Sequence, residues 1–232
     1  MNRAQLNQDG FHIARGVLNR DALDQVCRGA DESGTADKPN KRNLLSDSQV
    51  VADISLDDRM TSLVQASLGA DAFPVRALWF NKSNEENWPV AWHQDLTIAV
   101  DKQVNLDGFS NWTEKQGVTH VEPPVEILES MLTIRMSIDP SDASNGGLHV
   151  LPGSHKLGRV LSSELSSMTE RFTPACPQMN AGDVLIMHPL LIHSSPRSQS
   201  ESNRRVLHIE YCNQELPEGL NWYFRRPKAP KP

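Results

Sequence analysis

The sequence predicts a mainly β domain with helices at its amino-terminal end. Apolar residues recur at helical spacing only within residues 1–70. From about residue 73, apolar and polar residues alternate with a period of two, and short apolar segments are separated by Gly- and Pro-rich turns. The length of 232 residues suits one large domain over 1–232 better than two ordinary ones. We therefore expect helices first and then a β-sandwich, barrel or jelly roll.

Two helices are expected within residues 1–70. The segment 21–28 carries apolar residues three and four positions apart, and so does the segment 57–68, which is followed by Gly69, a common helix stop. The intervening residues 31–42 are rich in Gly, Ser, Asp, Lys and Pro, which predicts an exposed loop.

The clearest strands are expected at 131–139 and 205–211, where every second residue is polar or smaller. Their polar-side rows consist of Thr133, Arg135, Ser137 and Asp139 in the first strand and Val206, His208 and Glu210 in the second. A polar row on an antiparallel sheet usually meets water. It can instead line the inside of a barrel or jelly roll that holds a ligand.

The segment 101–125 is expected to be a long irregular loop. It contains four Gly or Pro residues together with Phe109, Trp112 and His120. A loop of this length in a compact domain is usually functional or disordered, and its aromatic residues favour a lid over the site.

Composition excludes several classes of partner. There are 23 Lys and Arg residues against 29 Asp and Glu, so the net charge is −6, which argues against nucleic acid. No apolar run is long enough to cross a membrane, and residues 1–10 are too polar for a signal peptide. We expect a cytoplasmic protein that acts on a small molecule.

A metal site is indicated by the segment 92–95, Trp-His-Gln-Asp. Residues two apart on a strand share a face, so His93 and Asp95 can bind one cation. The same spacing also occurs in simple hydrogen-bonded pairs. A third ligand is expected from the segment 180–195, which carries both His188 and His193. Two histidines and one carboxylate on one side of an iron form the facial triad of non-haem Fe(II) oxygenases.

Four segments together resemble the phytanoyl-CoA dioxygenase family of Fe(II)- and 2-oxoglutarate-dependent oxygenases. They are Trp-His-Gln-Asp at 92–95, Asn-Gly-Gly-Leu-His-Val-Leu-Pro-Gly-Ser-His at 145–155, Gly-Asp-Val-Leu-Ile-Met-His at 182–188 and the arginine pair at 204–205. With Asp-Gly-Phe at 9–11, the resemblance spans nearly the whole chain. The segment 194–200 departs from it, with serines where the family often has glycine and asparagine.

This resemblance implies a double-stranded β-helix over 73–212 and a dioxygenase that uses Fe(II), 2-oxoglutarate and O2. The iron ligands it implies are His93, Asp95 and His193. Arg204 would bind the far carboxylate of 2-oxoglutarate, with Arg205 as the competing choice. Lys82 is a second candidate, but a simple surface lysine is the favoured alternative for it. Because halogenases of this kind lack the carboxylate ligand, Asp95 favours hydroxylation, with release of succinate and CO2, although other oxidations stay open.

Candidates for substrate binding surround this implied site. They are Trp92, Thr97, Trp112, His120, Arg135 and His208. An inward Arg135 suggests an anionic substrate, but a buried ion pair with Asp139 or Glu210 is an equal alternative. A zinc hydrolase and a non-catalytic binding or sensor module are the competing functions. The sequence identifies neither the substrate nor the oligomeric state.

Overall fold

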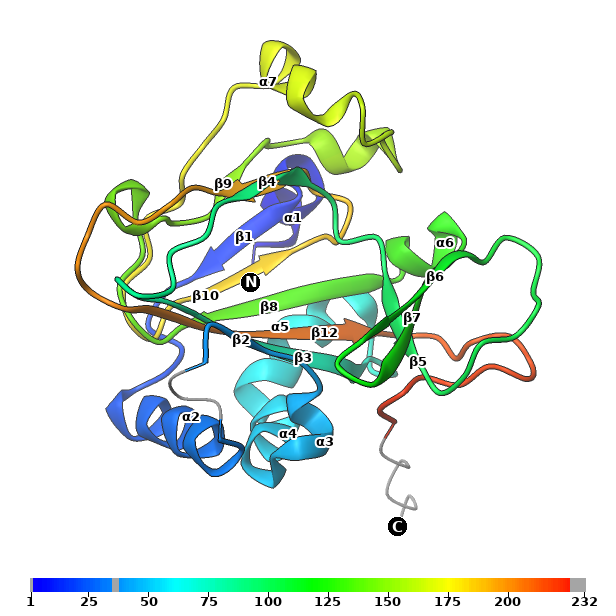
Figure 1. Cartoon of the computed structure of the whole chain (residues 1–232), viewed down its shortest axis with the longest axis horizontal. Helices are drawn as coiled ribbons and strands as arrows, with labels where there is room; N and C mark the ends of the chain where they lie inside the picture. The colour runs from blue at the N-terminus through cyan, green and yellow to red at the C-terminus, as the bar shows by residue number, and fades with distance from the viewer. Residues whose placement is uncertain (1, 35–37, 226–232) are drawn as a thin grey trace.

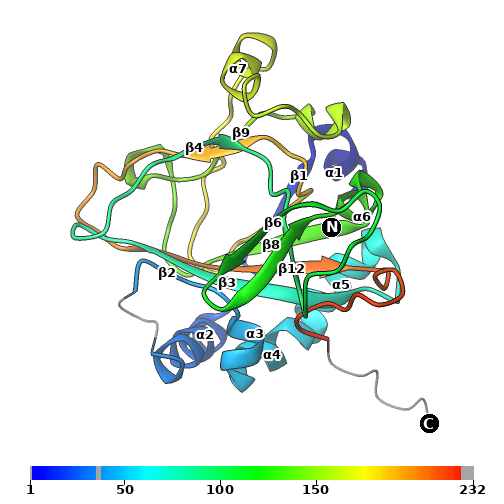
Figure 2. The same cartoon turned by 45° about the vertical axis from the view of Figure 1, so that its right-hand side comes forward.

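Two facing β-sheets, a third sheet of three strands and an outer layer of helices make up the described part of the protein (Figure 1). The computed structural model describes residues 2–34 and 38–225. The larger sheet is antiparallel with the order β1-β10-β8-β12-β3-β2, and the smaller sheet has the order β4-β11-β9. Figure 2 shows β4 and β9 on one side of the large sheet and α2, α3 and α4 on the other. This is the expected mainly β jelly roll with amino-terminal helices.

The elements have the following bounds. The helices are α1 (Arg3–Asp9), α2 (Arg20–Glu32), α3 (Leu44–Asp47), α4 (Gln49–Leu56), α5 (Asp58–Leu68), α6 (Val125–Glu129) and α7 (Met168–Arg171), with 3-10 turns η1 (Ala143–Asn145), η2 (Ser154–Leu157) and η3 (Leu165–Ser167). The strands are β1 (Phe11–Ala14), β2 (Asn40–Lys41), β3 (Phe73–Lys82), β4 (Val90–His93), β5 (Ile98–Val100), β6 (Ser110–Lys115), β7 (Val118–Glu122), β8 (Met131–Ser137), β9 (His149–Val150), β10 (Val184–Met187), β11 (His193–Ser195) and β12 (Arg204–Cys212).

The two faces of the large sheet have different roles. On β12, Leu207, Ile209 and Tyr211 pack against the helices, together with the apolar row of β8. The alternate residues of both strands face the small sheet across an internal space. The polar rows of β8 and β12 therefore face the interior, and the alternative in which they meet open water is wrong. Asp139, expected in the first row, lies beyond the end of β8 and pairs with Arg205 instead.

Residues 1–70 supply the helical layer and two edge strands. Asn19 caps α2 by accepting a hydrogen bond from the backbone of Ala22, and Gly69 ends α5 at positive φ. The strands β1 and β2, which were not expected, extend the two edges of the large sheet. The expected loop 31–42 is shorter than predicted because α2 continues to Glu32 and β2 begins at Asn40, and its residues 35–37 lie outside the described part of the chain.

The expectation of an irregular loop over 101–125 is corrected. This segment contains β6 and β7, which form a hairpin that pairs with β5. Gln116 and Gly117 both have positive φ at the turn, as a tight type I′ hairpin requires. The usual signal for such a turn is Asn-Gly or Asp-Gly, so Gln-Gly gave little warning. In the described part of the chain, no helix is both long and apolar enough to span a membrane.

A close backbone approach holds the turn before β10. Gly182 has a φ of +88°, and its carbonyl accepts a hydrogen bond from the Leu18 backbone at 3.0 Å. A Cβ at this position would collide with the Leu18 carbonyl oxygen. We predict that Gly182→Ala lowers the free energy of unfolding by about 3 kcal/mol, from backbone strain and forced displacement together.

The matched control for this prediction is Gly117→Ala. Gly117 also has positive φ, but an added Cβ meets no atom within 4 Å. We expect a loss of about 1 kcal/mol, from backbone strain alone. Urea denaturation measures both values, and equal losses in the two variants would contradict the role assigned to Gly182.

Candidate metal centre

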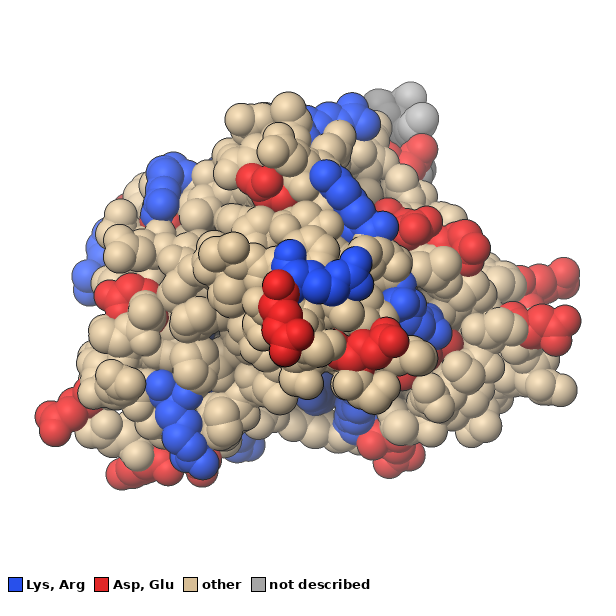
Figure 3. All heavy atoms as spheres, turned by 90° about the horizontal axis from the view of Figure 1, so that it is seen from above, with Lys and Arg blue, Asp and Glu red and all other residues tan. Residues whose placement is uncertain are grey.

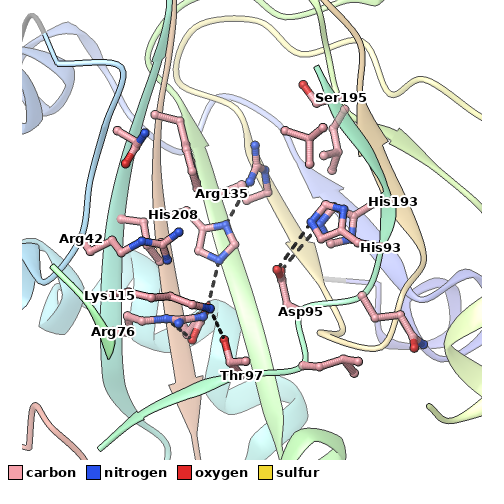
Figure 4. A pocket seen from close by; sticks show the side chains of 18 of the residues that line it. Arg42, Arg76, His93, Asp95, Thr97, Lys115, Arg135, His193, Ser195 and His208 are labelled. Atoms are coloured by element: carbon pink, nitrogen blue, oxygen red, sulfur yellow. Dashed lines mark hydrogen bonds and ion pairs between the residues drawn. The ribbon is translucent and has the colours of Figure 1, made fainter. Parts of the chain in front are cut away.

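The internal space between the two sheets is a cavity of about 500 Å³. Its floor is the large sheet, and its roof includes the ends of β4 and β11. Figure 4 shows His93, Asp95 and His193 together on one side of this cavity. Ser195, Arg135, His208, Arg76 and Lys115 extend around it.

Strand pairing brings the three candidate ligands together. His93 ends β4 and His193 begins β11, and the antiparallel register places these two residues directly opposite each other. Their rings lie 4.1 Å apart between centroids. Asp95 follows β4, and its backbone N–H donates to the carbonyl of Pro189 at 2.9 Å. One ligand atom from each of the three residues lies within 4.8 Å of the other two.

Hydrogen bonds set both histidines for metal binding. The Nδ1 atoms of His93 and His193 each lie 2.8 Å from the backbone carbonyl two residues earlier, so Nδ1 carries the proton. Each Nε2 then offers a lone pair toward Asp95. The Nε2–oxygen distances are 3.9 Å from His93 and 3.7 Å from His193, too long for hydrogen bonds.

The carboxylate of the cluster is available to bind a cation. Among the described residues, Oδ2 of Asp95 is buried without a hydrogen-bond partner. Burial raises the pKa of Asp95, but His193, His208, His93 and Arg76 outweigh it and hold this pKa well below its ordinary value. Burial and the neighbouring His93 lower the pKa of His193 to about 3, so its ring is neutral. Two imidazole lone pairs and one carboxylate fit a divalent transition metal.

Arg204 lines the same cavity, and its guanidinium makes few hydrogen bonds. Its side chain is buried, its Nε has no hydrogen-bond partner among the described residues, and Nη2 makes one long bond of 3.4 Å to Oγ of Ser195. Burial and the nearby Arg135 lower its pKa to about 9. A buried guanidinium in this condition suits an incoming carboxylate.

Arg205, the competing choice, faces the other way. Adjacent residues of a strand point to opposite faces, so Arg205 lies on the helix side of β12. There it donates to both carboxylate oxygens of Asp139, at 2.8 and 2.7 Å. This bidentate pair leaves Arg205 outside the cavity lining.

Lys82 is buried beside Arg204. It is only 1% exposed, and its Nζ donates to the Ser195 hydroxyl at 2.7 Å and to the Pro196 carbonyl at 2.6 Å. The alternative of a simple surface lysine is wrong. Burial, together with Arg204, Arg135 and Arg197, lowers the pKa of Lys82 to about 7.

A hydrogen-bonded chain crosses the cavity floor. Nη1 of Arg135 donates to Nδ1 of His208 at 3.0 Å, and Nε2 of His208 lies 3.3 Å from Glu210. Both carboxylate oxygens of Glu210 also accept hydrogen bonds from one edge of the Arg76 guanidinium, its Nε and Nη2. Burial lowers the pKa of His208, which keeps its ring neutral in this chain. Arg135 does not form the expected ion pair with Asp139 or Glu210, because those carboxylates bind Arg205 and Arg76.

Four other sequence candidates occupy different places. Thr97 lines the cavity, where its hydroxyl lies 3.4 Å from Nζ of Lys115. Trp92 precedes His93 on β4, so it faces away and packs against a separate apolar cluster. Trp112 packs beneath the β5–β7–β6 sheet. His120 is fully buried behind the cavity wall, with burial and Arg76 lowering its pKa to about 4. Trp92, Trp112 and His120 are therefore not cavity-lining residues, contrary to expectation.

His188, the rival third ligand, lies apart from the cluster. Its ring stacks on His155 with centroids 5.0 Å apart, and it is absent from the cavity lining. The structure therefore brings His193, rather than His188, to His93 and Asp95.

Three basic residues of the cavity were missed by sequence reasoning. They are Arg42, Arg76 and Lys115. Arg76 could have been noticed as the single charge inside the apolar run 73–80. Arg42 and Lys115 lie in polar segments, where a charged residue gives no signal.

Comparison with known proteins agrees with this geometry. Residues 6–206 match the family model described as phytanoyl-CoA dioxygenase. A rice protein, phytanoyl-CoA dioxygenase 1 of Oryza sativa subsp. japonica, is 23% identical over 150 residues, covering 59% of this chain and 50% of the rice protein. The chain thus spans about half the length of this relative.

Solved structures share the fold. AviO1 from Streptomyces viridochromogenes superposes with a TM-score of 0.67 and 20% identity, covering 92% of this chain and 94% of AviO1. HygX from Streptomyces hygroscopicus, solved with nickel and 2-oxoglutarate bound, gives a TM-score of 0.66 and 19% identity, covering 91% of this chain and 87% of HygX. Because the family model covers most of the chain, the protein belongs to the phytanoyl-CoA dioxygenase family.

Proposed function

We propose that the protein is an Fe(II)- and 2-oxoglutarate-dependent dioxygenase that hydroxylates a small molecule and releases succinate and CO2. The observation that carries this proposal is the shared cavity of a two-histidine, one-carboxylate cluster and a buried, nearly unpartnered arginine. A zinc hydrolase would use the same cluster to activate water, but it has no use for Arg204.

Each residue of the site has a definite task. His93, Asp95 and His193 would hold the iron and leave its other positions open to cosubstrate and oxygen. Bound iron would supply the redox chemistry that couples O2 to the oxidation of 2-oxoglutarate and of the substrate. Arg204 and Lys82 would bind the far carboxylate of 2-oxoglutarate and so orient it. The intact Asp95 supports hydroxylation rather than halogenation.

Related enzymes support the choice of cosubstrate. HygX was solved with 2-oxoglutarate bound, and EctD from S. alaskensis with 2-oxoglutarate and 5-hydroxyectoine. The β6–β7 hairpin is the part of segment 101–125 that we propose as a cover of the site, because Lys115 extends from it into the cavity. A single domain over 1–232 and a cytoplasmic location remain predictions.

A metabolite-library screen that measures succinate tests the class and the substrate together. We expect succinate to form from 2-oxoglutarate only with Fe(II) and O2, and faster with the true substrate. Protein that binds both iron and 2-oxoglutarate but forms no succinate would instead be a binding or sensor module. Turnover with zinc and without 2-oxoglutarate would indicate the hydrolase.

The first prediction about the site concerns the metal ligands. We expect Asp95→Ala and His193→Ala to weaken Mn(II) binding more than about 100-fold, beyond the 10- to 100-fold cost of losing a ligand's hydrogen-bond partner. His188→Ala is the control and should bind Mn(II) normally. Equilibrium dialysis measures the affinities. Normal metal binding by Asp95→Ala would refute the assigned site.

The cosubstrate arginine gives the second prediction. Arg204→Gln should retain Mn(II) and bind 2-oxoglutarate about 100-fold more weakly, because a charge-assisted hydrogen bond contributes about 1.5–3 kcal/mol. Arg205→Gln is the matched control from the opposite face of β12, and its affinity should change less than about threefold, far below one such bond. Titration calorimetry measures both. The reverse pattern would transfer the role to Arg205.

A pH dependence gives the third prediction. Lys82 has a pKa of about 7, so raising the pH removes positive charge that the carboxylate needs. The affinity of the metal-loaded protein for 2-oxoglutarate should therefore fall as the pH rises from about 7 to about 9, by up to about tenfold per pH unit for one coupled proton. Lys82→Met should flatten this dependence near pH 7. An unchanged slope in that variant would exclude Lys82 from the cosubstrate site.

A further inference from the structure

The cavity has more basic than acidic side chains, and the proposed iron and cosubstrate sites do not account for all of the basic ones. Its basic residues are Arg42, Arg76, Lys82, Lys115, Arg135 and Arg204, against the acids Asp95, Glu122 and Glu210. The whole chain has a net charge of −6, and on the face seen in Figure 3 basic and acidic side chains are interspersed. The positive excess is therefore a property of the cavity.

Each acid of the cavity already has a partner. Asp95 belongs to the metal cluster, Glu210 pairs with Arg76 and His208, and Glu122 lies 3.5 Å from Nη1 of Arg159. No described carboxylate of the cavity pairs directly with Arg42 or Lys115, and Glu210 and Asp95 offset only part of the effects that lower the pKa of these two cations. Within residues 2–34 and 38–225, neither side chain forms an ion pair.

Arg42, Arg76 and Lys115 form one group at the end of the cavity away from the metal cluster (Figure 4). Burial lowers the pKa of Arg42, and the positive charge of Arg76 lowers it further. Burial also lowers the pKa of Lys115, with further contributions from Arg42 and Arg76. The three cations are thus close enough to repel one another, which costs stability unless an anion joins them.

Arg76 supplies a donor that is free and buried. Its side chain is 6% exposed, and Nε and Nη2 bind Glu210. Nη1 has no hydrogen-bond partner among the described residues. A buried guanidinium nitrogen in this state is costly unless a ligand accepts its hydrogen bond.

Gln116 links the segments that carry the other two cations. Its side-chain oxygen accepts from the backbone N–H of Arg42 at 2.9 Å, and its backbone carbonyl accepts from Asn43 at 3.5 Å. Lys115 is the preceding residue, and its Nζ reaches Thr97 at 3.4 Å. The edge of the large sheet and the β6–β7 hairpin are therefore joined where the two cations enter the cavity.

We infer that Arg42, Lys115 and Nη1 of Arg76 form a second anion-binding site, which takes a carboxylate, phosphate or sulfate group of the substrate. Arg204 and Lys82 are left for 2-oxoglutarate at the other end. The substrate is then a small organic anion whose charged group binds here while its reactive carbon lies near the metal. The assignment to the substrate rests on the proposed function, whereas anion binding itself does not.

Titration calorimetry with simple anions tests this site without turnover. The protein is loaded with Zn(II) and saturated with N-oxalylglycine, an inert analogue of 2-oxoglutarate, and then titrated with inorganic phosphate, sulfate or acetate in chloride-free buffer. We expect one anion per chain, with the preferred anion indicating the chemical group of the substrate. Arg42→Gln and Lys115→Gln should each weaken its binding at least about tenfold.

The exposed residues Arg28 and Lys102 provide matched controls. Arg28→Gln and Lys102→Gln should bind the anion as the unchanged protein does, and unfolding midpoints verify that every variant is folded. The inference is overturned if no anion binds, if Arg42→Gln and Lys115→Gln bind it normally, or if N-oxalylglycine blocks it by occupying this end. Anion binding through Arg42 in a protein that never forms succinate would refute the proposed function and leave this site standing.

Discussion

The antiparallel pairing of β4 with β11 is the constraint on which the site depends. It places His93 opposite His193 although these residues lie 100 positions apart in the chain. Both histidines donate from Nδ1 to nearby carbonyls, which turns both lone pairs toward Asp95. The paired strands therefore orient the three candidate ligands toward one cation position before any ligand binds.

The cavity floor contains charged side chains that form hydrogen bonds with one another. Arg135, His208, Glu210 and Arg76 satisfy one another along neighbouring strands, so most of the polar row is fixed in place. Among the described residues that line the cavity, the buried donors without acceptors lie on Arg204 and on Arg76. Burying such groups costs free energy in the absence of ligand, and that cost is recovered when an anion binds. We therefore propose that these two groups mark where anionic ligands bind.

Sequence reasoning reached the fold class because the alternation of apolar and polar residues is a strong local signal. Residues two apart on a strand placed His93 with Asp95, whereas His193 and Arg204 came from the resemblance to a family. Sequence reasoning failed where tertiary context decides. The Gln116-Gly117 turn lacks the residue types that usually indicate a hairpin. Trp92 was expected at the site because it precedes His93, although adjacent residues of a strand face opposite sides. Arg42 enters the cavity only because distant segments meet at Gln116.

We propose that one cavity holds a cation site and two separate anion sites. A crystal structure grown without oxygen, with Fe(II) and 2-oxoglutarate, would reveal the occupants of this cavity. We expect iron on His93, Asp95 and His193, with the far carboxylate of 2-oxoglutarate on Arg204 and the Arg42–Lys115 end free of it. Iron bound elsewhere, or 2-oxoglutarate with that carboxylate on Arg42 and Lys115, would contradict it.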